Sequence, residues 1–197
     1  MNLSKKILIS TVALTILVLG GCSSGSTTTP KTSDDDKTRI IDNAQYDFNV
    51  RIPREWDVIE AKDFTSEVPK QTVIVFRNNV KNEDFTANVN VIRNTLQTPR
   101  ETLDYAKQVL NRQKGGLYNY RETARDLVQV SITGKKVDTY LTHFEAKKDP
   151  ASELTKFVQT YAVKGSEAYI VTGSLSPKEN TNNANTVDEI VKSFTIK

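Results

Sequence analysis

Four segments of alternating apolar and polar residues follow one another in the second half of the chain, at about residues 120–132, 137–146, 156–163 and 168–175. An alternation with period two is typical of β-strands that bury one face. The pairs Gly134-Lys135 and Lys164-Gly165 mark tight connections between neighbouring segments. Because strands joined by tight turns pair antiparallel, the sequence predicts an antiparallel meander.

Three shorter strands are predicted before the meander, at residues 46–52, 72–77 and 87–91. The first alternates apolar and polar residues and stops at Pro53, and the third alternates in the same way. The second is apolar on both faces, which predicts a strand near the centre of the sheet.

Two amphipathic helices interrupt the β pattern. The first is predicted to begin at Thr98, which forms a capping box with Glu101 and is followed by Pro99, and to stop at Gly115-Gly116. The second covers about residues 183–193 and has one apolar stripe. Since strands and helices do not alternate regularly, the pattern favours an α+β domain over a doubly wound parallel sheet.

The first 22 residues have the layout of a bacterial secretory signal. Lys5 and Lys6 precede about a dozen mostly apolar residues, which end in Leu19-Gly20-Gly21-Cys22. This run is shorter than the roughly 20 residues that a membrane span needs. Its ending resembles the bacterial lipobox, and the resemblance implies cleavage between Gly21 and Cys22 and attachment of lipid to Cys22. An ordinary secreted protein with a cysteine near its cleavage site is the alternative.

The predicted organisation has three parts: a lipoprotein signal peptide at 1–21, a lipidated cysteine and flexible Ser/Thr/Asp-rich tether at 22–39, and a single domain at 40–197. The predicted location is extracytoplasmic, with the chain lipid-anchored to the cell membrane. Ser23, where some sorting signals carry aspartate, permits the outer membrane if the cell has two.

The charge and the cysteine count exclude other classes of protein. The formal charge of +3 falls to +1 without Lys5 and Lys6, which gives no field for attracting nucleic acid. The one cysteine, Cys22, excludes an internal disulfide.

No catalytic residue, cofactor site or metal site is predicted. The only histidine, His143, would be the base of any Ser-His-Asp constellation, but a histidine at a sheet surface that pairs with a polar neighbour is the simpler interpretation. Residues 21–25 match the pattern G-x-S-x-G without the strand and helix that this elbow requires. Phe157, Tyr161 and Tyr169 are expected to pack within the sheet, although a few aromatic side chains could line a groove.

Several segments, in this order and spacing, resemble the Mog/PsbP-like superfamily, and within it the bacterial PsbP-like and DcrB-like lipoproteins: residues 48–56, 87–91, the helix after Thr98-Pro99, 161–163, 169–174 and 190–196. The likeness covers roughly residues 40–197. It implies a central antiparallel sheet flanked by helices on both sides, an α-β-α sandwich. It also implies a non-enzymatic accessory, assembly or binding role.

The expected function is therefore that of a membrane-anchored extracytoplasmic lipoprotein whose PsbP-like domain serves as an accessory, assembly or protein-binding module of the cell envelope. Its expected partners are the membrane, through the lipid on Cys22, and an envelope protein of unknown identity. Two alternatives remain open: a lipoprotein that binds a small ligand or a metal, and a hydrolase that uses His143.

Overall fold

The computed structural model describes residues 37–42, 45–65, 68–80 and 85–197. The predicted signal peptide, the Gly21–Cys22 cleavage site and most of the tether lie outside the described residues. The elements, in chain order, are β1 (Thr38–Ile41), β2 (Phe48–Pro53), β3 (Asp57–Glu60), a 3-10 turn (Ala61–Asp63), β4 (Thr72–Arg77), β5 (Asn88–Thr95), α1 (Thr102–Gly116), β6 (Tyr118–Ile132), β7 (Lys135–Lys147), β8 (Thr155–Lys164), β9 (Glu167–Leu175), α2 (Thr181–Lys192) and β10 (Thr195–Ile196).

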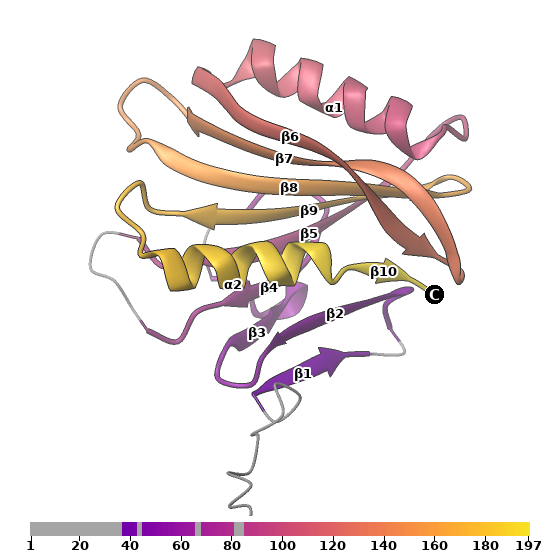
Figure 1. Ribbon diagram of the computed structural model, residues 1–197, viewed down its shortest axis with the longest axis horizontal. Coiled ribbons are helices and arrows are strands. Elements are labelled where there is room, and N and C mark those ends of the chain that lie inside the picture. Colours follow the sequence, from indigo (N-terminus) through magenta and orange to yellow (C-terminus); the bar gives the residue numbers. More distant parts are fainter. Residues whose placement is uncertain (1–36, 43–44, 66–67, 81–84) are drawn as a thin grey trace, which may run out of the picture. The chain divides into compact units, whose positions relative to one another are not determined.

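The described strands form one sheet in the order β1-β2-β10-β6-β7-β8-β9-β5-β4-β3 (Figure 1). All neighbouring pairs are antiparallel except β10 and β6. The predicted meander is confirmed as β6 to β9, with the turn before β7 at Thr133-Gly134, where both φ angles are positive. Strand β4 has the predicted bounds, but it lies one strand from the sheet edge and not at the centre.

The first helix begins later than its capping signal predicts. Glu101 is the N-cap and makes no side-chain capping hydrogen bond, and the helix starts at Thr102. The Thr102 hydroxyl instead accepts a hydrogen bond from the backbone N–H of Val163 on β8, at 3.2 Å. A tertiary contact with the sheet therefore sets this helix end. The second helix is capped by Asn180, whose side chain accepts from the N–H of Asn183.

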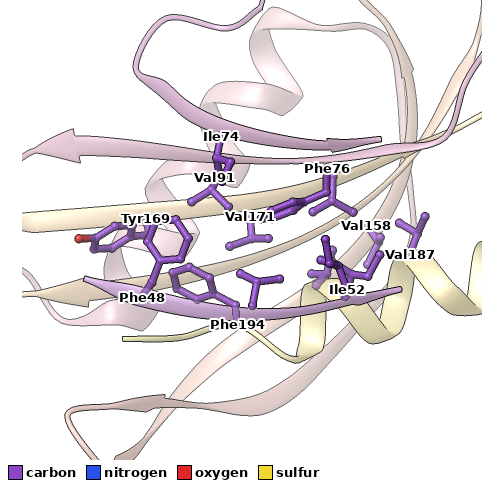
Figure 2. Close-up of a cluster of buried hydrophobic side chains, with 14 of the residues drawn as sticks. Phe48, Ile52, Ile74, Phe76, Val91, Val158, Tyr169, Val171, Val187 and Phe194 are labelled. Carbon is purple, nitrogen blue, oxygen red and sulfur yellow. The ribbon is translucent and has the colours of Figure 1, made fainter. Parts of the chain in front are cut away.

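The core lies on both faces of the sheet. On one face, Tyr169 and Val171 of β9 pack with Phe48 of β2 and with Val187 of α2 (Figure 2). On the other face, Ala168 and Ile170 of the same strand pack with α1. Because side chains alternate along a strand, α1 and α2 contact opposite faces.

The predicted α-β-α sandwich is wrong, because the domain is mostly β. The two helices have 15 and 12 residues, and each covers only part of its face. The rest of the core around α2 is closed by the sheet itself, which curls so that Phe48 of β2 reaches Tyr169 of β9 with ring centroids 5.9 Å apart. A long antiparallel sheet twists strongly enough to bury much of its own surface. No second helical layer is therefore needed.

Candidate functional site

A cavity of about 850 Å³ lies beside the last turn of α1, on the face of the sheet that this helix only partly covers. The residues at its base come from β5, β8 and β9, and those around it come from β4, from the chain after β3 and from Gln113 and Leu117 near the end of α1. We call this space the sheet cavity. Its volume is within the range of pockets that hold small molecules.

The base of the sheet cavity is a row of polar side chains that crosses neighbouring strands. Gln159 of β8 is paired in register with Thr172 of β9, and Thr172 is paired with Asn90 of β5. These three residues are only 3%, 8% and 9% exposed. Next to them, Ser174 is paired with Asn88. A sheet face that served only as core would carry apolar residues here.

Hydrogen bonds fix the orientation of part of this row. The Tyr161 hydroxyl donates to Oε1 of Gln159 at 2.7 Å, and Nε2 of Gln159 donates to Oγ1 of Thr172 at 2.7 Å. Burial raises the pKa of Tyr161, so its hydroxyl stays protonated and remains the donor. The chain of hydrogen bonds ends at Thr172, directly beside Asn90.

Three polar atoms of cavity-lining residues are buried and have no hydrogen-bond partner among the described residues. They are Oδ1 of Asn90, Oε1 of Gln113 and Nε of Arg77. An unpaired buried polar group costs about 1–3 kcal/mol. Two acceptors and one donor are thus left unsatisfied around one cavity.

Aromatic and aliphatic side chains form much of the rest of the lining, which also contains Asp63, Thr65, Lys148 and Thr155. Phe144 and Phe157 stack with ring centroids 4.9 Å apart, and Tyr120 stacks on Phe144 at 5.1 Å. Phe64, Phe85 and Leu117 also line the cavity. An apolar wall with a few convergent polar groups is the usual composition of a small-molecule site.

His143 lies on β7, and its Nε2 atom is 3.0 Å from Oδ1 of Asp188 on α2. This pair lies on the α2 side of the sheet, whereas the sheet cavity lies on the α1 side. The hollow beside His143 contains Thr123 but, among the described residues, no serine or cysteine. The interpretation of His143 as a histidine paired with a polar neighbour is confirmed.

The His143–Asp188 pair makes stability depend on pH. The hydrogen bond to Asp188 raises the pKa of His143, while nearby Lys192 opposes the shift and Asp126 supports it. Burial alone would raise the pKa of Asp188, but the contacts with His143 and Lys192 outweigh it and lower that pKa. A raised histidine pKa means that the pair contributes fully below about pH 6.5 and loses its contribution as pH rises through the folded-state pKa.

We therefore expect His143→Gln to destabilise the protein more at pH 5.5 than at pH 8.5. The difference between the two losses should be about 1 kcal/mol, as for a partly exposed ion pair. Urea unfolding of the wild type and the variant at both pH values measures this difference. An equal loss at both values would contradict a charged pair.

The sheet cavity brings together residues that are far apart in the sequence and that were not predicted to form a site. Ser174 and Phe157 line the sheet cavity, whereas Tyr161 and Tyr169 are buried in the two cores. Sequence reasoning missed Asn90, Gln113 and Gln159 as site residues. For Asn90 and Gln159 a signal existed, since they are polar residues within strands that are otherwise apolar, whereas Gln113 lies on helix α1. Gly21 and Cys22 lie outside the described residues.

Within the described part of the chain, no three His, Cys, Asp or Glu side chains come close enough together to hold a metal ion. No helix formed by the described residues has the length and hydropathy of a membrane span.

Comparison with known proteins gives likeness at the level of fold. Neither the models of known protein families nor the curated proteins contain a match to this chain. Among solved structures, the cyanobacterial PsbP (CyanoP) of Synechocystis sp. PCC 6803 is 13% identical, with a TM-score of 0.55 over 91% of this chain and 99% of that one.

Two other solved structures are similar. LpqN, involved in cell envelope biogenesis of Mycobacterium tuberculosis, is 10% identical, with a TM-score of 0.52 over 81% of this chain and 90% of that chain. A protein of unknown function, PA94 from Pseudomonas aeruginosa, is 12% identical, with a TM-score of 0.50 over 79% of this chain and 94% of that one. Identities this low show the fold alone. The described domain has a PsbP-like fold.

Proposed function

We propose that this chain is a lipid-anchored extracytoplasmic protein, a PsbP-like and DcrB-like lipoprotein whose domain is a non-catalytic accessory, assembly or protein-binding module of the cell envelope. The observation that carries the non-catalytic part is the separation of His143 from the sheet cavity. The only histidine of the chain is held in an ion pair on the opposite face, and the base of the cavity offers amides and hydroxyls. Such groups bind and orient a ligand, but they are poor general bases at neutral pH.

The anchoring part of the proposal rests on the sequence Leu19-Gly20-Gly21-Cys22 after a short apolar run. The envelope part is supported by the fold shared with LpqN, which is involved in cell envelope biogenesis in its own organism. Two or three acyl chains on one cysteine would hold a protein stably at a membrane, whereas a single chain gives only marginal binding.

Replacement of Cys22 by serine tests the anchor. We expect Cys22→Ser to lose all incorporation of an alkyne-tagged palmitate and to accumulate at the mass of the uncleaved chain, because the thiol accepts the lipid before cleavage. The matched control, Ser24→Ala, should be labelled and cleaved as the wild type is. Mass spectrometry of mature wild-type protein with an unmodified Cys22 would refute the anchor.

Crosslinking in living cells tests the accessory role. The full chain is purified from crosslinked membranes beside a control in which the same first 39 residues carry an unrelated folded domain. We expect one envelope protein to be enriched repeatedly with the full chain and not with the control. Recovery of the same proteins from both would show that the domain itself recruits none.

A second function, small-ligand binding, is favoured by the sheet cavity and its unpaired polar atoms. A ligand present at 100 times its dissociation constant stabilises a protein by about 2.7 kcal/mol. A thermal-unfolding screen of neutral, acidic and basic amphiphiles should therefore raise the melting temperature with one class and leave it unchanged with the others.

A further inference from the structure

We propose that the sheet cavity binds a neutral amphiphile, which has an apolar chain and a head group of hydroxyls or amides. The apolar chain lies against the aromatic side chains Phe144 and Phe157, and the head group forms a hydrogen bond with Asn90 at the base. This inference rests on small-ligand binding, the second proposed function, and names its ligand class.

The unpaired buried amide of Asn90 points to a polar head group. Asn90 is 9% exposed and lies on a central row of the sheet, where an apolar residue would avoid the cost of an unpaired amide oxygen. The last torsion of an asparagine side chain is soft, so a small rotation can bring either its oxygen or its NH₂ group to a ligand. A polar group of a ligand beside Asn90 would form the hydrogen bond that the amide oxygen of Asn90 does not make within the protein.

The kinds of unpaired atoms favour a neutral head group. The oxygens of Asn90 and Gln113 need donors, and Nε of Arg77 needs an acceptor. A hydroxyl or an amide both donates and accepts, whereas a carboxylate only accepts and leaves both amide oxygens unpaired. The Arg77 charge is already compensated, since its Nη2 atom donates to Oδ2 of Asp57 at 2.9 Å. The polar row at the base, Asn90, Gln159 and Thr172, is uncharged, and the other two charged residues of the lining, Asp63 and Lys148, have opposite signs.

The aromatic lining of the cavity favours an apolar chain on the ligand. The stacked pair Phe144–Phe157 forms a flat apolar surface next to the polar row, and Phe64, Phe85 and Leu117 add to it. A cavity of about 850 Å³ is near the upper end of the range for small-molecule sites. An alkyl chain fills such a space and gains free energy by leaving water.

Photolabelling in isolated membranes that contain the full chain tests the proposal. The probe is a 1-O-alkylglycerol that carries a diazirine and a terminal alkyne on its chain, and the comparison probe is the fatty acid with the same chain. We expect saturable labelling by the alkylglycerol on peptides that line the cavity, and labelling about tenfold weaker by the fatty acid at equal concentration.

Asn90→Leu removes the polar anchor while keeping the number and branching of the side-chain heavy atoms. We expect its labelling by the alkylglycerol to need about tenfold more probe, the effect of one lost hydrogen bond to a buried group. The matched control is Asn94→Leu, on the same strand and the same face but outside the cavity, which should be labelled as the wild type is. A second variant, Leu117→Trp, adds bulk to the lining of the cavity and should weaken labelling whether or not Asn90→Leu folds.

The proposal is overturned by equal labelling with both probes, by labelling that does not saturate or maps elsewhere, or by unchanged labelling of the folded Asn90→Leu or Leu117→Trp. A failed anchor would change where the chain is found but not which probe labels it. Absence of any saturable labelling would reject the neutral amphiphile, whereas a positive thermal screen with another class would keep small-ligand binding.

Discussion

Replacement of Phe194 by alanine is expected to lower the free energy of unfolding by about 3–5 kcal/mol. Phe194 is 1% exposed and lies between α2 and β10. Its ring centroid is 5.3 Å from that of Phe48 on β2 and 5.7 Å from that of Tyr169 on β9 (Figure 2). The ring therefore packs between β2 and β9, which are far apart in the strand order. Its removal leaves a cavity that the side chains of neither strand can fill alone.

Urea unfolding followed by circular dichroism measures this loss, and Phe157→Ala is the matched control. Phe157 is only half-buried and lines the sheet cavity, so its removal should cost less than half as much. Equal losses in the two variants would contradict a central role for Phe194. A loss of the expected size is a large share of the 5–15 kcal/mol that stabilises a typical domain.

Any side chain at position 173 is expected to push α2 away from the sheet. A Cβ atom on Gly173 would overlap Cγ1 of Val187 on α2 and lie 2.8 Å from Cγ1 of Val158 on β8. Both valines are fully buried and packed, so they cannot move aside cheaply. We expect a loss of about 1–3 kcal/mol for Gly173→Ala and a larger one for Gly173→Val.

Two further variants distinguish this close approach from a general effect of losing a glycine. Gly115→Ala is the matched control, because no atom lies within 4 Å of the added Cβ and the change should be neutral or stabilising by about 0.4–1 kcal/mol. Val187→Ala should partly rescue Gly173→Ala, which a double-mutant cycle measures as a coupling of at least about 0.5 kcal/mol. Additive losses would mean that the two residues do not compete for space.

The sequence predicted the strands well where the alternation of apolar and polar residues was long. The alternation within β6 to β9 and the glycines in their turns were enough for the meander, because side-chain period and turn geometry are local properties. The start of α1 was predicted wrongly at Thr98. Its capping signal competes with a tertiary contact, the bond from the Val163 N–H to the Thr102 hydroxyl, which the sequence does not reveal.

The arrangement of the elements was harder to predict. The apolar run of β4 is typical of a central strand, yet β4 lies next to the edge strand β3. Both of its faces are nevertheless used, because Ile74 and Phe76 belong to the core around α2 and Val75 lines the sheet cavity. The α-β-α sandwich was also predicted wrongly. Curling of a ten-stranded sheet depends on the summed twist of all its strands, and no single segment encodes that sum.

The candidate site was missed in the sequence because its residues look ordinary there. Asn90, Gln159 and Thr172 are polar residues in alternating strands, which a sequence reading assigns to a solvent-exposed face. They are buried because β5, β8 and β9 bring them into one row and because distant segments wall that row in. The single histidine was interpreted correctly, since one imidazole without a cluster favours a paired surface residue.

The sequence by itself determined the strands of the meander, the two helices and the interpretation of His143, because these follow from periodicity, turn residues and the count of one histidine. It also carries the whole basis for the anchor at Cys22, which remains a prediction. Only the tertiary structure decided that the sheet curls on itself, that Gly173 is the contact point of α2, and that Asn90 is buried at the base of a cavity. These features depend on pairings between strands that are far apart in the chain. The burial of a residue is decided by the assembled sheet and not by the residue type alone.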